Sequence, residues 1–97
     1  MTTIEVVCDP IESEWECSVR VADDAGATGH EVTVSAADLP RLVPTPDFDD
    51  VERLVRETFE FLLEREPKES ILPRFDLSVV GRYFPEYERE IRLRLLR

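Results

Sequence analysis

The residues DFDDVERLVRETFEFLLERE, at positions 47–66, decide how this chain folds. Their apolar side chains recur every three or four residues, and this spacing places them on one face of an α-helix. No other segment of the 97 residues is so long and so regular. The pattern predicts a central helix at 47–66, ended by Pro67, since proline disfavours helical geometry in the residue before it. The predicted face contains Phe48, Val51, Val55, Phe59 and Leu62.

The apolar face of this helix is wider than packing on a single sheet requires. Leu54 and Phe61 widen one side of it, and Leu63 lies on the opposite flank. We therefore expect a second contact for the helix, with the C-terminal segment, with another subunit, or with both. Leu54, Phe61 and Leu63 are candidate interaction residues on this basis, and a homodimer is the expected form of self-association.

The region before the helix predicts a three-stranded antiparallel sheet. Apolar and polar residues alternate at 2–8, 15–22 and 31–35, which is typical of strands with one packed and one wet face. The connections are short enough for hairpins, so a meander is the simplest topology. Asp9-Pro10 is expected to begin the first turn, because proline has no N–H to donate. The predicted inward residues are Ile4, Val6, Cys8, Trp15, Cys17, Val19, Val21, Val32 and Val34.

The region after the helix predicts one or two further helices within 70–97. Asp76 suits the cap of a short helix, and Pro85-Glu86 suits the first turn of a last one. Residues 91–95 also alternate as a strand would, but their strong helix formers favour a helix. The predicted class is α+β, in a single domain of residues 1–97. Its parts are an antiparallel sheet at 1–35, a connector at 36–46, the central helix at 47–66 and a C-terminal helical segment at 70–97.

Charge is distributed unevenly along the chain. The net charge is −10, and all of the excess acid lies in residues 1–50. An acidic half repels phosphate backbones and anionic membranes, which argues against both as partners. Arg89, Arg92 and Arg94 form a basic patch near the end of the chain and are candidate interaction residues. Arginines near a helix C-terminus have an ordinary explanation in the helix dipole. They could also dock on the acidic half of a neighbouring molecule, and nucleic acid is the less favoured partner.

Three residues, Cys8, Cys17 and His30, are the soft metal ligands of this sequence. Their spacing is not that of a zinc site, so they are weak metal candidates. The favoured interpretation treats both cysteines as small buried hydrophobic residues and His30 as a surface or loop residue. A cross-strand disulfide is the other alternative, because Cys8 and Cys17 share one face of the predicted hairpin. The serines sit in no nucleophile motif, so neither a catalytic site nor a cofactor is predicted.

The sequence contains no signal-peptide stretch and no apolar run of about 18 residues, the length that a spanning helix needs. The expected compartment is therefore the cytoplasm.

Two segments carry a resemblance to known families. The runs FEFLLEREPKESIL and FDLSVVGRYFPEYE, within 59–87, resemble a family of small prokaryotic proteins that has no assigned activity. A fainter likeness is to HicB-type antitoxins. There 15–35 would be the strand hairpin, Asp38-Leu39-Pro40 the turn and 51–64 the helix, with a departure at Arg41-Leu42. This second resemblance implies a regulator that binds a toxin or nucleic acid.

The function expected from these observations is a non-enzymatic protein-interaction module that binds itself or another protein. The over-wide helix face and the lack of a catalytic constellation support it. The antitoxin-like regulator is the alternative. No small-molecule substrate, cofactor or membrane partner is predicted.

Overall fold

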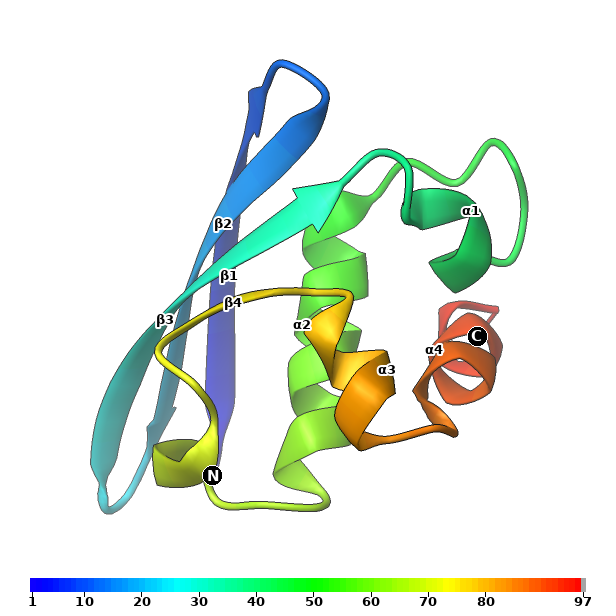
Figure 1. Ribbon diagram of the computed structural model, residues 1–97. Coiled ribbons are helices and arrows are strands. Elements are labelled where there is room, and N and C mark those ends of the chain that lie inside the picture. Colours follow the sequence, from blue (N-terminus) through cyan, green and yellow to red (C-terminus); the bar gives the residue numbers. More distant parts are fainter. Residues whose placement is uncertain (97) are drawn as a thin grey trace.

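The computed structural model describes residues 1–96 as a mixed four-stranded sheet with helices packed on one of its faces (Figure 1). Three long strands, β1 (Thr3–Ile11), β2 (Glu14–Asp23) and β3 (Gly26–Ser35), form the expected antiparallel meander. A short strand, β4 (Arg74–Asp76), then pairs with β3 in parallel, which gives the order β1-β2-β3-β4. The α+β class is confirmed. Arg97, the last residue of the predicted C-terminal segment, lies outside the described residues.

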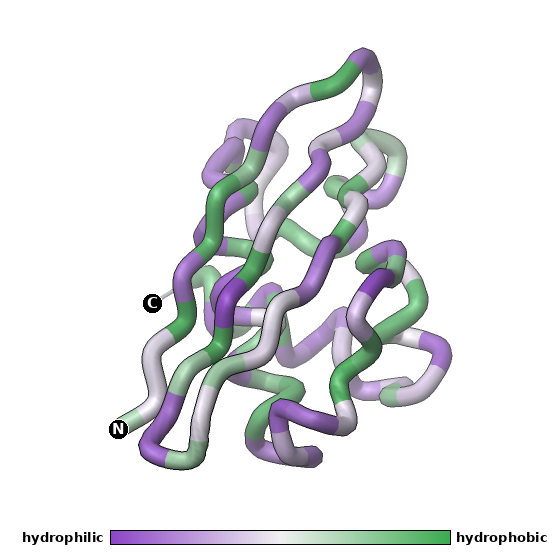
Figure 2. Tube along the Cα trace, turned by 90° about the vertical axis from the view of Figure 1, so that its left-hand side faces the viewer, coloured by the Kyte–Doolittle hydropathy of each residue, from purple (hydrophilic) through white to green (hydrophobic). Residues whose placement is uncertain are grey.

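The helices all lie on one side of the sheet. Figure 2 looks onto the opposite face of the sheet, where no helix of residues 1–96 covers the strands. Hydrophobic and hydrophilic residues alternate along those strands, as a sheet with one packed face requires. The helical elements are α1 (Leu39–Leu42), α2 (Val51–Leu63), the 3-10 helix η1 (Lys68–Ser70), α3 (Val79–Tyr83) and α4 (Tyr87–Leu95).

The predicted inward face of the three long strands is confirmed. Its members are either buried in the core or packed against it at partial exposure. The first strand, however, runs through the predicted turn at Asp9-Pro10 and ends at Ile11. The reason is that β1 is an edge strand, and Pro10 stands at a position whose backbone points away from β2. A missing N–H group costs nothing at such a position.

The fourth strand corrects the prediction of a purely antiparallel, three-stranded sheet. Only three residues form β4, too few for an alternating pattern to be recognised in the sequence. Within it, Phe75 faces the core while Arg74 is exposed. The chain leaves β3, passes through α2 and returns as β4, and a parallel return of this kind needs a long crossover such as a helix.

The central helix is shorter than the predicted 47–66 and spans Val51–Leu63. Asp50 caps it, since its side-chain Oδ1 accepts the Arg53 backbone N–H at 3.0 Å. The preceding residues make a turn instead, in which the Phe48 N–H bonds the Thr45 carbonyl at 3.2 Å. A central helix is therefore present, as predicted, but residues 47–50 and 64–66, which the prediction included, lie outside it.

The second contact of α2 is the C-terminal segment, one of the expected alternatives. The Phe61 ring meets the rings of Phe84 and Tyr87, with centroids 5.7 Å and 5.3 Å away. A buried hydrogen bond of 2.7 Å joins Thr58 Oγ1 to the Tyr87 hydroxyl, and burial raises the pKa of that phenol. Residues 91–95 lie within α4, so the helical interpretation of that stretch is confirmed. Its alternation is produced by a helix that buries Ile91 and Leu95 on one side.

Residues 67–77, here called the strap, fasten the end of α2 to β3. The Glu31 N–H bonds the Pro73 carbonyl at 2.8 Å, and the Leu77 N–H bonds the Thr33 carbonyl at 2.9 Å. Lys68, the only lysine of the chain, is 4% exposed and lies 2.9 Å from Asp23 Oδ1 at the β2–β3 turn. It also pairs with Glu69 at 2.7 Å. The strap thus ties the sheet to the helical layer through an ion pair whose cation is buried.

We predict that Lys68→Met lowers the urea midpoint of unfolding at pH 7. The methionine keeps the apolar stem but leaves Asp23 without its cation. Lys68 holds the pKa of Asp23 below 3.8, so the stabilisation is complete above that value and is lost as the pH falls through the lower, folded pKa. Urea titrations at pH 7 and about pH 2.5 should therefore show that the difference in unfolding midpoint between Lys68→Met and the unmodified protein is smaller in acid.

The matched control is Arg20→Met, which removes the exposed Arg20–Glu5 pair of 3.3 Å. Exposed ion pairs contribute only about 0–1 kcal/mol to stability. The urea midpoint of this variant should therefore stay close to that of the unmodified protein. A Lys68→Met effect of the same size at both pH values would contradict the role given to the ion pair.

Candidate functional site

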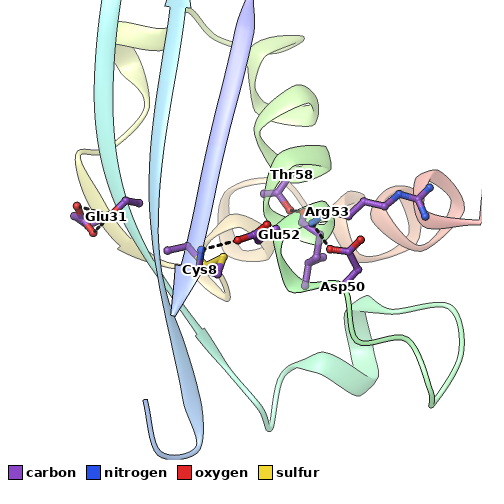
Figure 3. Close-up of a disulfide and its surroundings, with 9 residues drawn as sticks. Cys8, Glu31, Asp50, Glu52, Arg53 and Thr58 are labelled. Atoms are coloured by element: carbon purple, nitrogen blue, oxygen red, sulfur yellow. Dashed lines mark hydrogen bonds between the residues drawn. A yellow bond between two sulfur atoms is a disulfide. The ribbon is translucent and has the colours of Figure 1, made fainter. Parts of the chain in front are cut away.

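A disulfide joins the edge strand to its neighbour. Cys8 and Cys17 are cross-strand partners with Cα atoms 4.0 Å apart, and their sulfur atoms are bonded (Figure 3). From the first turn of α2, the Glu52 carboxylate accepts the Cys8 backbone N–H at 3.1 Å. The favoured interpretation of two free buried cysteines is wrong, because the register brings the two side chains directly opposite each other. The disulfide was the alternative that the sequence left open.

The disulfide also corrects the weak metal candidates. Both thiols are consumed, and no group of three or more His, Cys, Asp or Glu side chains in residues 1–96 could hold a metal ion. His30 is buried, not a surface residue, since β3 begins earlier than predicted and places it on the inner face opposite Val19. Its Nδ1 donates to the Leu72 carbonyl at 2.8 Å, and its Nε2 then accepts from Thr28 Oγ1 at 2.9 Å. His30 is therefore a structural residue that anchors the strap.

The three apolar candidates on the central helix lie in different surroundings. Leu54 and Phe61 are fully buried inside the monomer, so they do not form a contact surface for another chain, which corrects that expectation. The reason is that α4 occupies the side of α2 that the sequence left without a partner. Leu63 is partly exposed and packs against the edge of the core, so it can still contribute to a surface.

The basic candidates on α4 are mostly engaged within the chain. Arg94 bonds Glu64 at 2.6 Å and holds the pKa of that carboxyl below its usual value. Arg92 Nη1 donates to the Arg41 carbonyl at 2.7 Å. Arg89 is exposed on the outer side of α4. The predicted basic patch is therefore reduced to Arg89 and partly exposed neighbours, because the other guanidinium groups hold the helices together.

An apolar groove is a concave feature that the sequence did not reveal. It lies between the strap, the end of α2 and α3, and its volume is about 220 Å³. Ile71 and Val80 are buried in its floor, whereas Leu72 and Tyr83 at its rim are 48% and 70% exposed. The spacing of α3 contains no signal for it, since Tyr83 and Phe84 follow Val80 by three and four residues and both fall on the same helical face. The lining residues are Leu62, Glu66, Ser70, Ile71, Leu72, Phe75, Val79, Val80, Tyr83 and Phe84.

The free edge of β1 is the second exposed feature. The short Cα–Cα distance between Cys8 and Cys17 is that of a non-hydrogen-bonded pair, whose N–H and C=O groups point away from the neighbouring strand. Because this orientation recurs every second residue, the backbone groups of Ile4 and Val6 also point outward. Glu52 caps Cys8, but no comparable hydrogen bond from residues 1–96 covers Ile4 or Val6.

Comparisons with family models, curated proteins and solved structures gave no match for this chain. Both resemblances seen in the sequence therefore stay predictions. Within residues 1–96, no helix combines the length and the apolar character needed to cross a membrane.

We predict that replacing Cys8 and Cys17 together by alanine lowers the free energy of unfolding by about 2–3 kcal/mol. A crosslink that closes a loop of this length restricts the unfolded chain by about that amount. Urea denaturation followed by circular dichroism measures the difference, and reduction of the unmodified protein should have a similar effect. Equal stability of the reduced and oxidised proteins would show that the crosslink contributes nothing.

Proposed function

We propose that this chain is a non-enzymatic protein-interaction module. It binds a short segment of another protein through the groove beside α3, and it also associates with itself. The observation that carries the proposal is the apolar groove with two exposed hydrophobic side chains, Leu72 and Tyr83, at its rim. Exposed apolar residues gathered around a concavity are typical of interaction sites, unlike apolar residues scattered singly over a surface.

The size of the groove suits one or two side chains of a partner. Sites for small-molecule ligands usually enclose about 300–1,000 Å³ and bury most of the ligand. A groove of about 220 Å³ is smaller and open to solvent. A leucine or phenylalanine side chain would rest on Ile71 and Val80, between Leu72 and Tyr83.

The partner segment should place a basic residue beside this apolar anchor. Glu66 is the one charged residue of the groove lining, and it lies at the end of α2 next to the strap. The chain as a whole has a net charge of −10, which attracts basic partners over a longer range. Leucine or phenylalanine beside lysine or arginine is therefore the proposed recognition pattern.

The engagement of the arginines favours a protein partner over nucleic acid. A surface that binds a phosphate backbone needs several free cations, but Arg92 and Arg94 are held by Arg41 and Glu64. A toxin, as the antitoxin resemblance implies, would still be one possible protein partner. We propose the cytoplasm as the compartment. Disulfides are rare in an ordinary cytoplasm, so the Cys8–Cys17 bond would be an exception there.

We predict that peptides selected from a random displayed library on the immobilised protein share a large apolar residue next to a basic one. The double variant Leu72→Ser, Tyr83→Ser should weaken their binding tenfold or more, because it removes the apolar rim of the groove. Fluorescence anisotropy with a selected peptide measures the change.

The matched control is Leu93→Ser, Leu96→Ser, at the C-terminal end of α4. These residues are 55% and 64% exposed, close to the values at the groove rim, but they lie outside the groove. The control should bind the peptide as the unmodified protein does. Failure to enrich any common pattern, or equal binding by the rim variant, would refute the proposed site.

A further inference from the structure

We propose that two copies of this chain associate through their β1 strands, antiparallel about a two-fold axis at Ile4, to form one continuous eight-stranded sheet. The inference rests on the self-association included in the proposed function and specifies its surface and register. It follows from three constraints on the free edge of β1: which backbone groups point outward, which of them are already covered, and which side chains would face each other.

The outward-pointing groups limit the segment that can pair. Ile4 and Val6 present their N–H and C=O groups to the free edge, as the register with β2 requires. Farther along the strand, Glu52 occupies the Cys8 N–H, and Pro10 has none. Natural edge strands are protected by such devices where pairing must be prevented. Here the devices cover only the end of β1 that lies beside the disulfide.

Within residues 4–6, the uncovered segment of this edge, a two-fold axis can pass through Ile4, Glu5 or Val6. Two of these three registers are disfavoured. An axis at Val6 would require the Cys8 N–H, which Glu52 holds. An axis at Glu5 would place Glu5 directly opposite the partner's Glu5, and like charges in that position are destabilising. An axis at Ile4 avoids both obstacles. Glu5 then faces the partner's Thr3, and the bond from Cys8 to Glu52 remains.

The same register brings exposed apolar side chains together. On the inner face, Ile4 is only partly buried in the monomer and would pack on Ile4 of the partner subunit. On the outer face, Val7 is 60% exposed and would face the partner's Met1. Leu63 lies eleven residues after Glu52, which is three helical turns plus about 20°, so it projects from the same side of α2. The partly exposed Leu63 therefore lies toward this edge and would be shielded by the second copy.

The register is tested by mixing two single-cysteine variants, Thr3→Cys and Glu5→Cys, each with the native disulfide intact and with different affinity tags. Positions 3 and 5 of opposite subunits would form a non-hydrogen-bonded pair with Cα atoms about 4.5 Å apart, which suits a disulfide. Mild oxidation with diamide should give a covalent heterodimer in the mixture. Neither variant alone should crosslink, and Thr3→Cys mixed with Glu14→Cys, a position on β2, should not crosslink either.

Sedimentation velocity of the unmodified protein should show twice the monomer mass at high concentration. Val7→Lys should raise the dissociation constant of the dimer tenfold or more. Ile11→Lys, on the same face of β1 but outside the paired segment, should not change it. Crosslinking of Glu5→Cys with itself would overturn the register, and a protein that stays monomeric throughout would overturn the dimer. Either result leaves peptide binding at the groove intact, so it is distinguishable from failure of the groove proposal.

Discussion

The burial of Phe61 between α2 and the C-terminal segment is the constraint on which the rest of the structure depends. Its ring packs edge-on against Phe84 and Tyr87, and the guanidinium of Arg65, just beyond the end of α2, lies 3.6 Å from its centroid. These contacts hold the C-terminal segment against α2, while the opposite side of α2 covers the sheet. A helix buried on two sides explains the wide apolar stripe without a second subunit.

The placement of all helices on one face decides which surfaces remain free. The helices α2 and α4 pack side by side, and α3 and the strap, which also contribute to the core, form the apolar groove at its margin. On one side of the sheet, β4 pairs with β3 and His30 anchors the strap. On the other side, the outer edge of β1 has no partner strand in residues 1–96. The candidate interaction surfaces are therefore the margins of the two-layer arrangement.

The strong periodic signals of the sequence were sufficient for the α+β class, the strand faces and the existence of the central helix. They were insufficient where tertiary contacts decide. The sequence predicts Phe61 to be an interaction residue, because it cannot show which segment of the chain packs on it. β4 is too short to carry a pattern. The sequence places His30 at the surface or in a loop because the predicted strand begins at residue 31, five residues after the observed start of β3 at Gly26. Predicting the disulfide requires the register of β1 against β2, and alternation of apolar and polar residues does not determine that register.

The most direct test of this account is the unfolding of a Phe61→Ala variant followed by two probes. Trp15, the single tryptophan, reports on the sheet by fluorescence, and circular dichroism reports on the helices. Truncating a buried phenylalanine lowers the free energy of unfolding by about 3–5 kcal/mol. Because α2 couples the sheet to the C-terminal segment, both probes should report the same decrease. An unchanged tryptophan transition beside an early loss of helical signal would show that the C-terminal segment is a separate appendage.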